Sequence, residues 1–146
     1  MRRAITGAAA AVALSIAVGV PTAAAASKAQ PFTTKSLGAQ VSNNENVYDV
    51  RGNPPGASVQ IFKNNAKLTA GTATDTGYYG TGTVVSKDAY TLSKPNTKGI
   101  FTIKGTGRFV SGTGIYKHVK GSYKFTGTED VKTGVISGTV IGTRSL

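Results

Sequence analysis

The sequence predicts an all-β fold, a single antiparallel β-barrel of about eight strands, preceded by a helical signal peptide. After residue 26 the chain holds 17 glycines and 18 threonines. Threonine favours pleated strands, and glycine ends strands and permits tight turns. Short alternating segments separated by turn signals are typical of a barrel or a sandwich. The chain has no cysteine, and closure into a barrel would protect strand edges without disulfides.

The first 26 residues have the organisation of an export signal. Arg2 and Arg3 precede an apolar stretch over 8–20, and small residues at 23–26 provide a cleavage site after Ala26. A run of this length is too short for a membrane span, which needs about 20 residues. We expect a signal peptide at 1–26, a flexible lead-in at 27–37 and the barrel at 38–146. The expected localisation is secreted and extracellular, and the alanine-rich signal suggests a bacterial exporter.

The charge balance is strongly basic. The sequence has 17 lysines and arginines against six acidic residues, and without Arg2 and Arg3 the net charge is +9. Such a surplus favours association with an anionic cell-wall polymer or another polyanion. Solubility alone is the simpler explanation. Because no five basic residues occur in a row, the sequence predicts no dedicated nucleic-acid site.

The clearest local prediction is a β-hairpin. Residues 57–63 alternate, and Asn64-Asn65 suits a two-residue turn because asparagine tolerates positive φ. This turn would pair Ile61 with Leu68 and Val59 with Ala70.

Weaker signals divide the rest of the chain. Asp75-Thr76-Gly77 predicts the next turn. The segment 87–99 is expected to be a loop or a short edge strand, and 129–134 a further turn. Strands are expected over 99–107, 120–128 and 135–143. The last of these has apolar residues on both faces, which suggests burial on both sides.

The densest motif is GTGRFVSGTGIY at 105–116. No helix follows it, so it is not a dinucleotide-binding loop. Physically, its glycines suit a tight connection between strands, with Phe109 and Tyr116 closing one end of the core. The segment resembles the glycine-rich hairpin of the allene oxide cyclase/dirigent-like β-barrel superfamily, whose barrels are calycin-like. The resemblance implies an eight-stranded barrel, trimerisation and cyclase-type chemistry on an apolar intermediate.

The residues give little support for catalysis or for a metal. His118 is the single histidine and has no acidic neighbour in sequence, and one histidine without cysteine does not make a zinc site. No catalytic residue, metal or cofactor is therefore predicted. The barrel interior remains as a candidate ligand site, with aromatic residues as its walls and Asp49 or Arg108 as a polar anchor. Its candidate ligand-binding residues are Tyr48, Asp49, Arg108, Phe109, Tyr116 and Tyr123. The alternative is that the aromatic side chains simply fill the core.

The sequence therefore predicts a secreted, non-catalytic barrel that binds a small apolar ligand or an anionic wall polymer. The alternative is a dirigent- or cyclase-like enzyme, which requires an open cavity with an inward-facing carboxylate or arginine. If Asp49 and Arg108 both point to solvent, this alternative is to be dropped. An inhibitor or toxin-like effector is a third class, which no specific motif supports.

Overall fold

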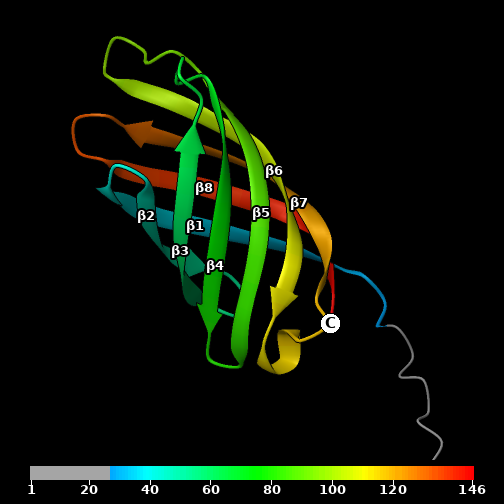
Figure 1. Ribbon diagram of the computed structural model, residues 1–146. Coiled ribbons are helices and arrows are strands. Elements are labelled where there is room, and N and C mark those ends of the chain that lie inside the picture. The colour runs from blue at the N-terminus through cyan, green and yellow to red at the C-terminus, as the bar shows by residue number, and fades with distance from the viewer. Residues whose placement is uncertain (1–26) are drawn as a thin grey trace, which may run out of the picture.

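The computed structural model describes residues 27–146, so the expected signal peptide lies outside the described residues. Eight antiparallel strands form one closed barrel in simple chain order (Figure 1), which confirms the predicted fold class. The strands are β1 (Gln30–Ser42), β2 (Glu45–Arg51), β3 (Gly56–Asn64), β4 (Ala70–Tyr79), β5 (Gly82–Leu92), β6 (Ile100–Gly112), β7 (Lys120–Asp130) and β8 (Val135–Ser145). A short 3₁₀ turn, η1 (Gly114–Tyr116), joins β6 to β7.

The barrel closes through β1, which pairs with β2 on one side and with β8 on the other. The pairing with β8 runs from Gln30 opposite Arg144 to Ala39 opposite Val135. The prediction of a flexible lead-in over 27–37 is therefore wrong, because β1 begins at Gln30 and completes the sheet. The segment lacks an apolar alternation because its inward-facing residues include Thr34 and Ser36, which are polar.

The predicted hairpin exists, but its register is wrong. Ile61 pairs with Thr74 and Val59 with Thr76, because a five-residue loop at 65–69 replaces the two-residue turn. The loop is held by Asn65, whose N–H donates to the Ala70 carbonyl at 2.8 Å and whose Oδ1 accepts from the Thr69 N–H at 2.9 Å. Asn65 thus stabilises the loop through hydrogen bonds of its side chain.

One turn prediction falls wholly on a strand and two others fall on strands in part, while the loop at 93–99 and the turn at 131–134 are confirmed. The Asp75-Thr76-Gly77 segment lies inside β4, and the turn to β5 occurs at Gly80-Thr81. Residues 87–92 continue β5, and Glu129-Asp130 end β7. These polar and glycine residues were interpreted as turn signals, whereas several of them face the barrel interior.

One end of the barrel is closed by a small apolar cluster. Tyr116 is only 1% exposed and packs with Val84 and Val119, against which Tyr79 and Phe109 also lie. The predicted role of Phe109 and Tyr116 at one end of the core is therefore confirmed. The η1 turn and the C-terminus lie at this end in Figure 1, and the loops after β3, β5 and β7 lie at the other.

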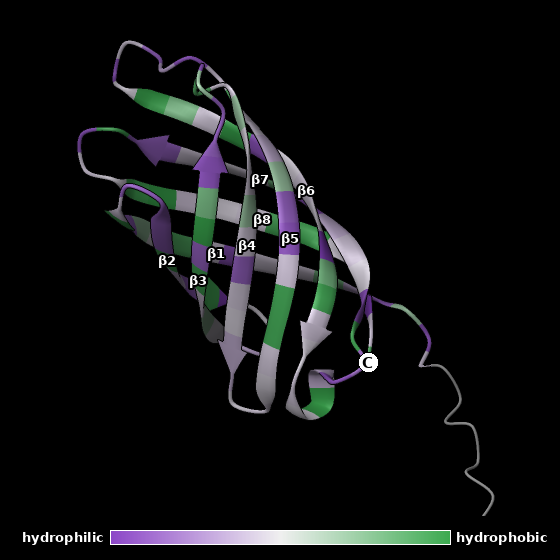
Figure 2. Ribbon diagram, in the orientation of Figure 1, coloured by the Kyte–Doolittle hydropathy of each residue, from purple (hydrophilic) through white to green (hydrophobic). Residues whose placement is uncertain are grey.

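Hydrophilic and hydrophobic residues are mixed along the strands of the barrel (Figure 2). Ser58, Ser86 and Asp88 are buried, while Leu37 and Ile61 are largely exposed on the outer face. The apolar outer positions also include Val135 and Ile141 of β8, so this strand is not covered on its outer face within one copy of the chain.

Glycines face aromatic residues across the strands. A Cβ atom on any of five such glycines would lie within 2.3–2.6 Å of an atom of the facing ring. Each of these five rings therefore lies along the sheet over its glycine and does not extend across the interior. The five register pairs are Gly38–Tyr48, Gly56–Tyr79, Gly71–Tyr90, Gly105–Phe125 and Gly107–Tyr123.

The change Gly107→Ala tests this packing. Its Cβ would lie 2.3 Å from both Tyr123 Cζ and Asp88 Oδ1, so the ring must move and overpack the wall. We expect a loss of about 1–3 kcal/mol in the free energy of unfolding, measured by urea denaturation. Gly80→Ala is the control because no atom lies within 4 Å of its Cβ. Equal stabilities of the two variants would contradict the glycine–aromatic packing.

Candidate ligand-binding cavity

The barrel encloses a cavity of about 660 Å³ that is lined by residues of all eight strands. Loop residues at one end, among them Leu68, Thr69 and Pro95, also line it, while the Tyr116 cluster closes the other end. Cavities of this size accommodate a small organic molecule. The interior is therefore a bounded site with one loop-bearing end.

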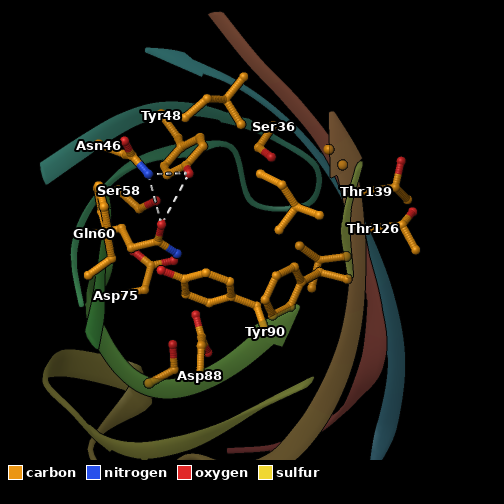
Figure 3. Close-up of a pocket in the computed structure, with 18 of the residues that line it drawn as sticks. Ser36, Asn46, Tyr48, Ser58, Gln60, Asp75, Asp88, Tyr90, Thr126 and Thr139 are labelled. Atoms are coloured by element: carbon orange, nitrogen blue, oxygen red, sulfur yellow. Dashed lines mark hydrogen bonds between the residues drawn. The ribbon is translucent and has the colours of Figure 1, made fainter. Parts of the chain in front are cut away.

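A belt of polar side chains crosses the cavity wall. Asn46, Gln60, Asp75 and Ser86 are consecutive register partners on β2, β3, β4 and β5, so their side chains share the inner face. Asn46 Nδ2 donates to Gln60 Oε1 and to Tyr48 Oη, both at 3.1 Å, and the Tyr48 hydroxyl donates to Gln60 Oε1 at 3.2 Å (Figure 3). These bonds fix one side of the belt.

The other side of the belt depends on a glycine. Gly107 of β6 lies between Asp88 of β5 and Tyr123 of β7 in the register. Since Gly107 has no side chain, the Tyr123 hydroxyl reaches across β6 and lies 2.6 Å from both Asp88 Oδ1 and Ser86 Oγ. This hydroxyl has one proton and donates to one of these two oxygens at a time.

Asp75 is the least satisfied group of the belt. It lies diagonally opposite Asp88 on neighbouring strands, and its Oδ1 has no hydrogen-bond partner among the described residues. Burial, and then the nearby Asp88 carboxylate, raise the pKa of Asp75 to about 7. The Ser58 hydroxyl and the Thr76 amide offset only part of this rise.

Other cavity groups are also shifted toward their neutral forms. Burial raises the pKa of Asp88, although the bond from Tyr123 opposes the rise. Burial also raises the pKa of Glu129 and that of Tyr90, the latter to about 12. The Tyr90 hydroxyl donates to Asn64 Oδ1 at 2.7 Å.

Half of the carboxylates of the chain line this cavity, namely Asp75, Asp88 and Glu129. Within 27–146 none of the three forms an ion pair, and the one ion pair found there joins Arg51 to Asp49 on the outer surface. The cavity is thus acidic inside a basic protein.

Four of the six predicted ligand-binding residues line the cavity: Tyr48, Phe109, Tyr116 and Tyr123. The other two, Asp49 and Arg108, are exposed on the outer face and do not line it. Each directly adjoins an inward aromatic residue, Tyr48 or Phe109, and neighbours on a strand face opposite sides. The proposed polar anchors are therefore wrong.

The polar residues that do face the cavity were missed by the sequence analysis. Asp75 was assigned to a turn, and Asp88 to an irregular segment. Strand alternation could have found Asp88, because it is two residues from both Ser86 and Tyr90 and therefore shares their face. Asp75 could not be placed while the β3–β4 register was wrong.

No three acidic or histidine side chains in the described part of the chain gather closely enough to hold a metal ion. His118 is exposed. Across residues 27–146 there is no helix of the length and hydrophobicity that a membrane crossing requires. No family model matches the chain, and no match was found among curated proteins or solved structures.

The pKa of Asp75 gives a pH-dependent stability. Between its ordinary value of 3.8 and about 7, the folded protein holds a proton that the unfolded chain releases. The free energy of unfolding should therefore fall as pH rises through this range, by an amount on the order of a few kcal/mol, and level off above it.

The variant Asp75→Asn should flatten this fall and be more stable than the parent chain at pH 8, because it cannot ionise. Thermal unfolding across the pH range measures this. Asp49→Asn is the matched exposed control and should keep the parent profile. Parallel profiles for Asp75→Asn and the parent would refute the assignment.

Proposed function

We propose that this protein is a secreted β-barrel that binds a compact, mainly apolar small molecule in its interior. The main support for this proposal is the open cavity, which has aromatic walls and a belt of polar groups. Barrels of eight strands either fill with side chains or hold one small ligand. The buried apolar cluster occupies one end only, which leaves the remaining interior for an occupant.

The composition of the wall indicates what kind of molecule fits. Phe101, Ile103 and Phe125 offer apolar contact, while Gln60 and Asp75 offer hydrogen bonds. A few polar groups within a mainly apolar lining are typical of sites that orient a ligand. A ligand with an aromatic or aliphatic body and one polar group matches this lining.

The charge of the outer surface supports an association with a second kind of partner, a polyanion. Every lysine in the described residues is exposed, so the positive charge is spread over the outside of the barrel. We propose that this charge keeps the secreted protein near an anionic cell-wall polymer. Membership of the allene oxide cyclase/dirigent-like superfamily, and the trimer that it implies, stay predictions.

Catalysis on an apolar intermediate is the second candidate. Because Asp49 and Arg108 both face outward, the cyclase-like site predicted on those two residues is dropped. Asp75 and Asp88, which line the cavity, provide a different pair of inward-facing carboxyl groups. A carboxyl whose pKa is near 7 can act as a general acid or base. An enzyme would release a chemically altered molecule, whereas a binding protein would release its ligand unchanged, and mass spectrometry of the bound and released molecule separates the two.

Binding of the neutral, fluorescent, apolar dye Nile red tests the proposed function. We expect saturable binding by the parent chain with enhanced fluorescence. Ser36→Trp should abolish it, because Ser36 lines the cavity and the indole would occupy the space (Figure 3). Thr33→Trp is the control, since Thr33 lies on the outer face of the same strand. Equal binding by both variants would place the dye outside the barrel and refute the proposal.

A further inference from the structure

The cavity has hydrogen-bond acceptors that the protein does not use. Asp75 Oδ1 and Asn46 Oδ1 are both buried and have no partner among the described residues. Asn46 is only 7% exposed, so bulk solvent does not reach most of its side chain. Leaving buried acceptors unpaired is unfavourable. A ligand that supplies N–H or O–H donors would satisfy them.

The same wall holds two neighbouring carboxyl groups without a counterion. Asp75 and Asp88 are diagonal neighbours on β4 and β5, and neither forms an ion pair within residues 27–146. A cation between them would remove their mutual repulsion, which is one of the causes that raise the pKa of Asp75. Buried carboxylates are ordinarily paired, so the missing positive charge can come from a ligand.

The protein's own cations that line the cavity lie at its two ends. Lys67 and Lys94 are exposed residues of the loops at the loop-bearing end. Arg144 donates to the Asn53 carbonyl at 3.0 Å and lies 5.5 Å from the centre of the Phe32 ring. None of the three contributes to the pKa of Asp75 or Asp88, so the belt has no resident partner of opposite charge.

Aromatic rings complete the setting for a cation. Tyr48, Tyr90 and Phe125 line the cavity together with the two aspartates, and Figure 3 shows Tyr48 and Tyr90 on the wall of this cavity. Ring faces attract organic cations, and they also cover the apolar part of such a molecule. A carboxylate pair with aromatic walls therefore suits an amine with an aromatic body better than a metal ion.

We propose that the interior site takes a small aryl-alkyl amine, whose ammonium group is held by Asp75 and Asp88. This inference rests on the proposed function. The ammonium N–H groups donate to the unpaired Asp75 Oδ1 and to the Asp88 carboxylate, while the ring lies against the aromatic wall. Selection against acids follows, because a carboxylate ligand would find no positive partner in the belt and would repel Asp75 and Asp88 in their ionised forms.

Three indoles that share one ring system and differ in charge test this inference. They are tryptamine, a cation; tryptophol, which is neutral and retains a donor; and indole-3-propionate, an anion. The chain has no tryptophan, so indole fluorescence reports the ligand alone. We expect tryptamine to bind at least about tenfold more tightly than tryptophol, the gain of roughly one charge-assisted hydrogen bond, and indole-3-propionate to bind most weakly.

Asp75→Asn keeps the shape of the side chain and removes its charge. It should reduce the preference for tryptamine over tryptophol by about tenfold. Asp88→Asn should independently reduce the same preference. Asp49→Asn removes an exposed outer carboxylate and should leave the preference unchanged. Nile red binding by each variant verifies that the cavity is intact.

The outcomes separate the two proposals. If Nile red binds but tryptamine shows no advantage over tryptophol, or Asp75→Asn and Asp88→Asn keep that advantage, the amine inference is overturned and the proposed function stands. If neither Nile red nor any indole binds the parent chain, the proposed function fails, and the inference fails with it.

Discussion

The packing of five inward aromatic rings over glycines on the neighbouring strands is the constraint on which the open barrel depends. An eight-stranded barrel is narrow, and rings pointing to its centre would fill it. Here the rings of Tyr48, Tyr90 and Phe125 lie over glycines instead, so the wall is aromatic and the centre stays open. Glycine weakens a strand on its own, and the covering ring restores contact across it.

The same constraint creates the chemistry of the cavity. Gly107 leaves a gap in the inner face of β6, through which Tyr123 bonds Asp88 and Ser86. Without that gap the two sides of the polar belt would be separated by a side chain. The glycine-rich stretch at 105–116 thus serves two purposes, because Gly105 and Gly107 shape the cavity wall and Tyr116 closes its end.

The polar interior reduces the stability of the fold. Asp75 is buried beside a second carboxyl, with one oxygen unpaired, and its raised pKa expresses that cost. Groups that reduce stability and gather in a cavity are common at functional sites. A cationic ligand would relieve the repulsion and the missing hydrogen bond together.

The sequence was sufficient for the fold and for half of the site. Composition and alternation predicted the barrel, and aromatic residues near the glycine motif identified Phe109, Tyr116 and Tyr123 as interior. In the polar half, strand alternation along β5 was enough to place Asp88. Asp75 could not be placed, because sequence rules put charged residues outside and interpret Asp-Thr-Gly as a turn. Asp75 and Gly77 are instead inward residues of β4. The polar and glycine residues that shape the cavity wall are therefore the same residues that the sequence rules assign to turns.

A crystal structure of the protein grown with tryptamine would test the central claim most directly. The account predicts the indole inside the barrel against the aromatic wall, with its ammonium nitrogen about 3 Å from carboxylate oxygens of Asp75 and Asp88. An interior filled by protein side chains would contradict it, as would an indole bound inside with its ammonium turned away from both aspartates.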